Sequence, residues 1–361
     1  MLNFAVGPVM MSDEVLAIGG EQIPYFRTPE FSRVMLENEQ AVKELMGAPD
    51  DARVIFMTGS GTASMEATVM NTLSGADRAL VVDGGSFGHR FCEILRIHGV
   101  PYTPIPCESG RVLTAEALAP FEGAGYTAFL VNLGETSTGV LYDLDLIADF
   151  CRRNRLFLIV DAISSFLCDP LDMRAAGVNV VITGSQKALA TAPGISVICC
   201  DRTAQERIAA AGVASLYFDL SAYLRDGERG QTPFTPAVGI LLQLHARLSQ
   251  LVRDGGVRRE VERARERAMY FRRQIEARGL PLRPFAEVPS NAVTSLVPVH
   301  EGISAYTVFE TLKDEYNIFV CPNGGALRDR VFRVGHMGAL TTADYDTLLT
   351  ALSELAAGGR L

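Results

Sequence analysis

Short apolar runs alternate with amphipathic stretches through the first two thirds of the chain. Helical patterns, as in Ser64–Leu73, His89–His98 and Leu144–Asn154, separate the runs. The runs are rich in Val and Ile with few polar residues, which is typical of strands buried on both faces of a parallel sheet. This alternation predicts a doubly wound α/β domain. The predicted strands are Arg53–Met57, Ala79–Val82, Ala128–Asn132, Leu156–Val160, Val178–Thr183 and Ile195–Cys200.

The pattern changes near residue 250. A long charged segment, Val257–Arg278, interleaves arginines with glutamates. A solvated helix with ion pairs four residues apart explains it better than a nucleic-acid-binding helix. Beyond it, strand-like runs at Ala292–Val299 and Arg330–Val334 flank a helical stretch near Ala305–Glu315.

These patterns predict two domains. We expect a large α/β domain over residues 15–250. A smaller α+β domain is expected over residues 251–361, together with the N-terminal residues 1–14.

Composition and charge narrow the classes of function. The chain has 361 residues, of which 48% are apolar, and a formal net charge of −9, which disfavours generic nucleic-acid binding. No apolar run approaches the roughly 20 residues that span a bilayer, and the segment MLNFAVGPVMM carries no basic residue. Seven scattered cysteines without a CxxC pair predict neither a disulfide framework nor a metal site. We therefore expect a cytoplasmic protein with no metal, nucleic-acid or membrane partner.

Two charged residues follow predicted strands. Lys187 lies in TGSQK, after the run VNVVI, and Asp161 follows the run LFLIV. Ligands of α/β proteins bind at the carboxyl ends of strands. Burial there makes a lysine amine a nucleophile, whereas a buried carboxylate needs a cationic or hydrogen-bonded partner. Taken alone, the lysine is better explained by an exposed loop, and the aspartate is equally suited to capping a helix or binding a metal or a ribose.

A glycine-rich loop, TGSGTAS (58–64), follows the run RVIFM. Its glycines let the backbone approach an anion, and a helix N-terminus with the hydroxyls of Ser60 and Thr62 supplies donors. The spacing matches neither GxGxxG nor a P-loop, and alone a plain tight turn explains it equally well. Together, an anion loop, a strand-end carboxylate and a strand-end lysine predict pyridoxal phosphate (PLP), which needs all three.

Six segments, in order, resemble the class V aminotransferases of PLP fold type I. The resemblance extends from Val6 to Arg333, and the branches most similar are the alanine–glyoxylate, serine–pyruvate and 2-aminoethylphosphonate–pyruvate transaminases. It implies a large doubly wound domain with a mainly parallel sheet and a smaller C-terminal α+β domain. The segments are GSGTASMEA (59–67), GGSFGHR (84–90), ETSTG (135–139), VDAISS (160–165), GSQKAL (184–189) and FRVGHMG (332–338).

The resemblance implies roles for the matching residues. Lys187 matches the lysine that forms a Schiff base with PLP, Asp161 the partner of the ring nitrogen, and Arg333 the arginine that binds the substrate carboxylate. The other matches contact the cofactor: Ser60, Gly61, Thr62 and Gln186 at the phosphate, Ile163 and Phe87 on the two ring faces, Thr138 near the phenolic oxygen, and Thr235 of a neighbouring subunit at the phosphate.

These roles imply an aminotransferase that acts by ping-pong kinetics through pyridoxamine phosphate. The donor is a small amine or amino acid, either 2-aminoethylphosphonate-like or alanine or serine, and the acceptor is pyruvate or glyoxylate. The segments PYFRTPEF (24–31) and GQTPFTPA (230–237) favour the phosphonate branch. Thr232 stands where the alanine–glyoxylate branch tends to have a tyrosine. Thr235 implies a homodimer with shared active sites.

Two alternatives remain open. A cysteine desulfurase or other lyase of this fold would use Cys321, but such enzymes place histidines where Phe87 and Gln186 stand. A PLP-free nucleotide-binding protein fits the glycine loop but not the pairing of Lys187 with Asp161. Other residues have simpler explanations. Phe87 alone would be an ordinary core residue, and His89, His98 and His336 are expected to be structural or solvent-facing. Arg27 is equally suited to a substrate entrance and to a surface position beside a helix.

Overall fold

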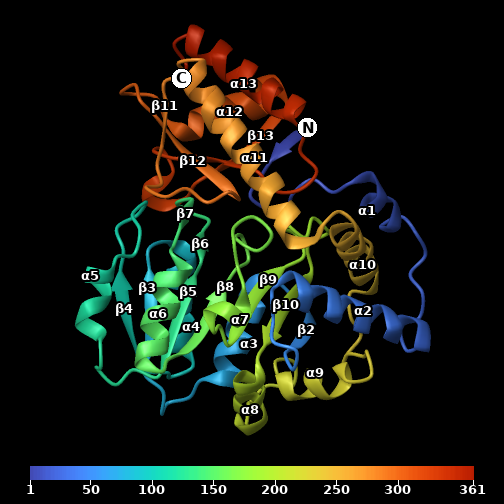
Figure 1. The fold of residues 1–361 in the computed structure, drawn as a ribbon. Coiled ribbons are helices and arrows are strands. Elements are labelled where there is room, and N and C mark those ends of the chain that lie inside the picture. Colours follow the sequence, from blue (N-terminus) through green and yellow to red (C-terminus); the bar gives the residue numbers. More distant parts are fainter.

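A seven-stranded sheet forms the centre of the larger part of the molecule, in a computed structural model that describes residues 1–361 (Figure 1). Its strand order is β2-β10-β9-β8-β5-β3-β4. All strands run parallel except β10, which is antiparallel to both β2 and β9. The strands are β2 (Arg53–Thr58), β3 (Ala79–Asp83), β4 (Tyr102–Pro106), β5 (Ala128–Asn132), β8 (Phe157–Asp161), β9 (Val180–Gly184) and β10 (Ile195–Cys200).

Helices cover both faces of this sheet because alternate strand residues point to opposite sides. In β2, Val54 and Phe56 join one apolar core while Ile55 and Met57 join another. One face is packed by α2 (Pro29–Leu45), α6 (Leu144–Asn154), α7 (Met173–Ala176) and α10 (Val238–Arg253). The other is packed by α3 (Gly61–Thr72), α4 (Ser86–Ile97), α8 (Arg202–Ala210) and α9 (Leu220–Gly227).

A second sheet of five strands lies above the first in Figure 1 and has its own core. Its order is β1-β13-β14-β12-β11, so the N-terminal strand pairs with a strand more than 300 residues later. The strands are β1 (Leu2–Phe4), β11 (Leu282–Pro284), β12 (Val293–Pro298), β13 (Ile318–Pro322) and β14 (Phe332–Gly335). Helices α11 (Gly256–Ala277), α12 (Ala305–Tyr316) and α13 (Thr342–Ala357) pack on it.

Smaller elements complete the chain. The hairpin β6 (Gly134–Glu135) and β7 (Val140–Leu141) lies between the two sheets in Figure 1, and α1 (Asp13–Ile18) packs against α10. The short α5 (Ala115–Leu118) follows β4. No helix has both the length and the apolar character needed to cross a bilayer.

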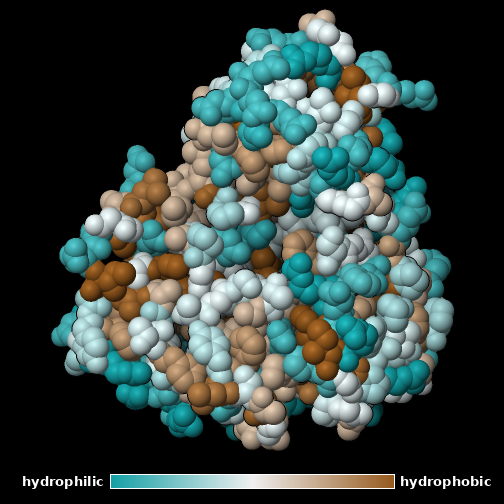
Figure 2. Space-filling view, turned by 180° about the vertical axis from the view of Figure 1, so that it is seen from behind, coloured by the Kyte–Doolittle hydropathy of each residue, from teal (hydrophilic) through white to brown (hydrophobic).

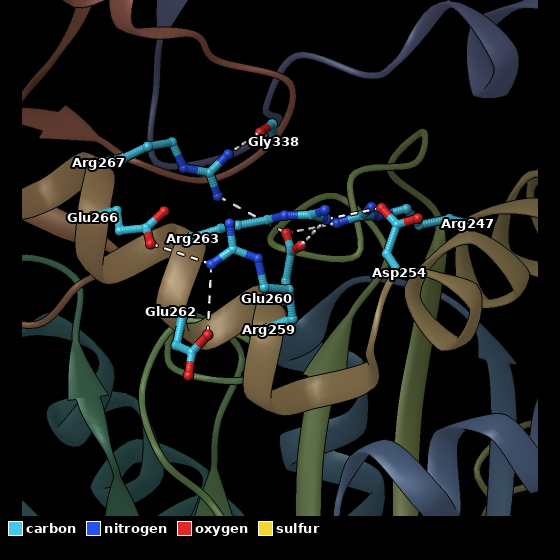
Figure 3. A network of polar contacts seen from close by, with 9 residues as sticks. All are labelled: Arg247, Asp254, Arg259, Glu260, Glu262, Arg263, Glu266, Arg267 and Gly338. Atoms are coloured by element: carbon cyan, nitrogen blue, oxygen red, sulfur yellow. Dashed lines mark hydrogen bonds and ion pairs between the residues drawn. The ribbon is translucent and has the colours of Figure 1, made fainter.

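Helix α11 is only partly the solvated helix predicted from its charges. Ion pairs such as Arg258–Glu262 (3.3 Å) do cover its exposed face. Glu260, however, is buried, and it accepts a hydrogen bond from Arg247 of α10 at 2.8 Å (Figure 3). Arg267 donates to the Gly338 carbonyl at 2.8 Å. This network joins α10, α11 and the loop after β14.

Two strand predictions need correction. The run Ile195–Cys200 is a strand, but an antiparallel one, because the connection formed by residues 185–194 returns it beside β9. Strand β4 was not predicted because Pro104 and Pro106 interrupt its apolar pattern. Proline is tolerated there since β4 is the edge strand of the sheet.

Candidate functional site

Lys187 lies three residues beyond β9 and is buried against the N-terminal segment. Its Nζ donates a hydrogen bond to the Val6 carbonyl. Gly7 is required there, since a Cβ would lie 2.7 Å from Lys187 Cδ. Burial, with the nearby charge of Arg333, lowers the pKa of the Lys187 amine to about 8, although Cys321 and Asp161 act in the opposite direction. The lysine is therefore buried rather than an exposed loop residue, and its lowered pKa would suit a nucleophile.

Asp161 is the last residue of β8 and is also buried. Its Oδ1 accepts the Ile163 N–H at 2.8 Å, and its Oδ2 accepts a hydrogen bond from Asn132 of β5. Burial raises the pKa of the Asp161 carboxyl to about 7, and the negative Glu135 adds to this. A cation placed against this carboxylate would favour its charged form.

The glycine loop opens helix α3. Ser60 is its N-cap residue, yet the Ser60 hydroxyl forms no capping hydrogen bond. A Cβ at Gly61 would lie 2.3 Å from Ile163 Cδ1, so the glycine allows the loop to meet the segment that follows Asp161. The Thr62 hydroxyl accepts a hydrogen bond from Arg90 at 3.2 Å. A helix N-terminus with an unused hydroxyl is suited to an anion.

Phe87 lies in the first turn of α4 and is half-buried. It belongs to none of the three apolar cores, which removes the explanation of an ordinary core residue. The Arg90 guanidinium lies 4.8 Å from its ring centroid. Its backbone N–H donates a hydrogen bond to the Glu135 carboxylate at 3.2 Å, and Glu135 lies in the segment ETSTG.

Arg333 lies in β14, and its guanidinium has no carboxylate partner. Nη1 donates to the Thr136 carbonyl at 3.1 Å, while Nη2 donates to the Pro322 carbonyl at 2.6 Å and to Cys321 Sγ at 3.2 Å. Its Nε is buried without any hydrogen-bond partner. Burial lowers the pKa of Arg333, and the charges of Cys321 and Glu135 oppose this.

We compared the chain with known protein families, proteins and solved structures. The family model of class V aminotransferases matches residues 25–324. The alanine–glyoxylate aminotransferase of Oryctolagus cuniculus is 31% identical, over 96% of this chain and 90% of its own. The soluble hydrogenase 42 kDa subunit of Anabaena cylindrica is 30% identical over the same shares. The crystal structure of an alanine–glyoxylate aminotransferase from Nostoc sp. matches with a TM-score of 0.92 and 25% identity, covering 98% of this chain and 94% of the other.

The chain belongs to the class V aminotransferases.

Class V aminotransferases depend on PLP, and the residues present fit this cofactor. The raised pKa of Asp161 marks a buried carboxylate that a protonated ring nitrogen would neutralise. Asn132 Oδ1, beside it, is buried without a partner. The free Ser60 hydroxyl at the N-terminus of α3 could donate to a phosphate group. Lys187 supplies the buried amine, so the three groups that PLP needs come from three neighbouring loops.

The other residues predicted to contact the cofactor make hydrogen bonds with their own surroundings or lie apart from Lys187 and Asp161. The Thr138 hydroxyl donates to the Glu135 carbonyl at 3.3 Å, and Gln186 follows β9 with its carbonyl bound by the Val9 N–H at 3.2 Å. Thr235 is exposed, and no contact in the single chain links it to the groups above. Thr232 is buried and donates to the Phe234 carbonyl at 2.7 Å, which is a local turn contact in place of a tyrosine contact.

Arg27 and the histidines lie outside this group of residues. Arg27 donates to Gln231 and to the Thr232 carbonyl, both at 3.4 Å, and so braces the segment that carries Thr235. His336 is fully buried between Thr294 (2.7 Å) and Tyr345 (3.1 Å), which is a structural role. No cluster of three or more histidine, cysteine, aspartate or glutamate residues could hold a metal ion.

A large apolar cleft of the protein is separate from this site. It has a volume of about 820 Å³ and lies beside α6, α7 and the start of α11. Leu144, Leu171 and Val257 are among its mostly apolar lining residues, and none of the predicted site residues lines it. Its size therefore does not identify the place of the chemistry.

Proposed function

We propose that the chain transfers an amino group from a small α-amino acid to glyoxylate or pyruvate at Lys187. The observation that carries the proposal is Arg333, a largely buried guanidinium with an unpaired Nε and no carboxylate partner. A planar guanidinium is the best protein donor for a carboxylate, which α-amino acids and both acceptors share. The two relatives named for alanine and glyoxylate support this choice of substrates.

The chain's own residues can divide the work. Bound PLP supplies an aldehyde that takes up the amino group and a ring that spreads the charge left on the substrate Cα. Because its pKa is lowered to about 8, Lys187 Nζ loses its proton much closer to neutral pH than an ordinary lysine, and it could first hold the cofactor and then take the Cα proton. Asp161 would hold the ring nitrogen in its protonated form, and Ile163 and Phe87 would be the residues that cover the ring.

The donor and the acceptor should bind in turn, because a single guanidinium serves both carboxylates. We therefore expect ping-pong kinetics, with parallel lines in double-reciprocal plots. Intersecting lines would contradict the shared Arg333 site.

Absorption spectra of PLP-loaded protein test the substrate assignment. L-alanine, L-serine, L-aspartate and 2-aminoethylphosphonate are each added, and the loss of the cofactor's visible band is followed. Conversion by alanine or serine, with recovery on adding glyoxylate or pyruvate, supports the proposal. Conversion by 2-aminoethylphosphonate alone would assign the phosphonate branch, since that donor has no carboxylate for Arg333.

A desulfurase remains the competing chemistry, because Cys321 Sγ lies 3.2 Å from Arg333 Nη2. Sulfide release from L-cysteine, abolished by Cys321→Ala, would replace the transaminase proposal. We expect Cys321→Ala to leave transamination of the accepted donor in place.

A homodimer is part of the proposal. Thr235 lines a cleft together with Ile23 and Tyr25, two apolar residues that are 66% and 69% exposed. Leu216, the residue before Tyr217, is 81% exposed. Tyr217 stacks on Phe234, next to Thr235, with ring centroids 5.3 Å apart. Hydrophobic residues gather toward the edge of the molecule on which α1 lies (Figure 2). Exposed apolar surface of this kind suits a protein interface.

Sedimentation velocity tests this assembly. The wild-type chain should sediment as a dimer, and Leu216→Asp should shift it toward the monomer with loss of activity. A fully active wild-type monomer would contradict a shared active site.

The cytoplasmic location is also proposed. Its support is that all seven cysteines are free thiols, as expected in a reducing compartment. Fractionation of cells that express the native protein tests it.

A further inference from the structure

Glu135 is a buried acid to which the proposed function gives no task. Its side chain, at the end of β6, is 1% exposed and forms no ion pair. Its carboxylate accepts hydrogen bonds on both oxygens instead. Oε2 accepts the N–H groups of Phe87 (3.2 Å) and Gly88 (3.1 Å), and Oε1 accepts the N–H (3.2 Å) and the hydroxyl (2.5 Å) of Ser137.

Gly85 makes this contact possible. A Cβ at Gly85 would lie 2.5 Å from Cγ and Cδ of Glu135 and from Oγ of Ser137. Gly85 is also the N-cap residue of α4 and has no side chain to cap it. The Glu135 carboxylate takes the place of that cap, and its negative charge is favourable at a helix N-terminus. Phe87, in the first turn, is held by this cap.

The residues after Glu135 hold the opposite part of the site. The Thr136 carbonyl accepts the hydrogen bond from Arg333 Nη1 at 3.1 Å. The Ser137 carbonyl accepts one from Asn323 Nδ2 at 2.8 Å, just beyond β13. Residues 135–138 therefore connect helix α4 of the large sheet with β13 and β14 of the small sheet.

We propose that Glu135 is a positioning residue that holds Phe87 and Arg333 at their working separation across the substrate site. This inference rests on the proposed function, in which Phe87 covers the cofactor ring and Arg333 binds the substrate carboxylate. A carboxylate is needed because both oxygens must accept hydrogen bonds. A glutamine turns an NH₂ group toward either the α4 amides or Ser137, so at least one set of bonds is lost.

The test compares Glu135→Gln with the wild-type holoenzyme. We expect faster hydrogen exchange at the amides of Phe87 and Gly88, with or without PLP, and a changed visible circular dichroism of bound PLP. The kcat/KM for the keto acid should fall about 100-fold, the size of effect that a displacement of about 1 Å produces.

Asp201→Asn is the matched control. Asp201 also caps a helix, accepting the Ala204 N–H at 2.7 Å, but it lies at the opposite edge of the sheet, where β10 ends. This control should lower the melting temperature while leaving the visible circular dichroism and kcat/KM unchanged.

Coupling to Phe87 separates positioning from general stability. If Glu135 acts through Phe87, Glu135→Gln should lower kcat/KM by a smaller factor in a Phe87→Leu background than in the wild type. Ser137→Ala keeps the two bonds from α4 to Glu135 but removes the one that the Ser86 N–H donates to Ser137 Oγ at 3.2 Å. It should show a smaller change in the same direction and serves if Glu135→Gln does not fold.

Unchanged circular dichroism and kcat/KM in Glu135→Gln, or fully additive losses with Phe87→Leu, would overturn the positioning role. A wild-type protein that binds no PLP would instead overturn the proposed function. The two failures are therefore distinct.

Discussion

Asn132 and Asp161 are direct partners across two adjacent parallel strands, and Asn132 Nδ2 donates to Asp161 Oδ2. The pair ends β5 and β8 at the edge where Lys187 also emerges. A hydrogen bond donated to a carboxylate favours its charged form, whereas burial opposes it. The net result is an Asp161 pKa of about 7, so without a cofactor the group is protonated in acid solution and loses its proton around neutral pH.

Asp161→Asn should therefore change how the stability of the PLP-free protein depends on pH. The folded pKa of about 7 exceeds the ordinary value of 3.8, so burial favours the protonated acid. Its stabilising contribution is fully present below about pH 4 and is lost as the pH rises to about 7. The loss is on the order of 4 kcal/mol at most, at 1.36 kcal/mol per pKa unit.

Asparagine does not titrate, so the variant should gain stability relative to the wild type between pH 4 and pH 8. Urea unfolding of both proteins at the two pH values measures this. A difference independent of pH would contradict the raised pKa. Adding PLP at pH 8 should stabilise the wild type more than the variant, because the ring nitrogen then pairs with the carboxylate.

Lys187 should be the residue that binds PLP covalently. The chain has only three lysines, and Lys43 and Lys313 lie on the surface helices α2 and α12. Borohydride reduction of the holoenzyme followed by peptide mass spectrometry should label Lys187, and labelling of another lysine would refute its role. Lys187→Ala should lower kcat by at least about 100-fold, the smaller end of general acid–base effects, while Lys43→Ala should not.

The lowered pKa of Lys187 also predicts a pH dependence. The rate at which the PLP-free protein binds PLP should rise with pH and level off above about pH 8, rather than near the ordinary value of 10.5. An inflection near 10 would mean that the amine is solvated in solution.

The strand and helix pattern was predictable where the signal was uninterrupted. The limits of β5, β10 and α6 coincide with their predicted ranges, because each is a continuous buried run or a strongly amphipathic stretch. The sequence also placed Lys187 and Asp161 at strand ends. Both placements follow from the sequence alone, because each residue comes shortly after an apolar run.

The contacts between distant segments were not predictable. The Glu135 carboxylate binds amides 47 and 48 residues earlier, and the Val6 carbonyl binds an amine 181 residues later. The pairing of Asn132 with Asp161 depends on β5 lying next to β8, and strand order leaves no mark in the periodicity. The glycines at positions 7 and 85 were the available signals, since each makes room for a side chain from another segment.

Gly61→Ala should weaken PLP binding. The added methyl would lie 2.3 Å from Ile163 Cδ1, so either the loop or the isoleucine must move. Overpacking of this kind costs about 1–3 kcal/mol, which predicts a PLP dissociation constant at least roughly 5-fold higher. Gly212→Ala, where a methyl meets nothing within 4 Å, is the control and should bind PLP as the wild type does. Equal affinities in both variants would show that the loop adjusts freely.

Arg333→Lys should raise the KM for the keto acid more than it lowers kcat. A lysine keeps the charge but cannot bind a carboxylate through two parallel N–H groups, and it cannot hold both the Thr136 and Pro322 carbonyls. Loss of one charge-assisted hydrogen bond is worth about 1.5–3 kcal/mol, which predicts a KM roughly 10- to 100-fold higher. Steady-state kinetics with glyoxylate and pyruvate measure this.

Arg330→Lys is the matched control. Arg330 is an exposed arginine three residues before Arg333, and its replacement should leave KM unchanged. If the two variants behave alike, the substrate carboxylate binds elsewhere, and the unpaired Nε of Arg333 then has only a structural meaning.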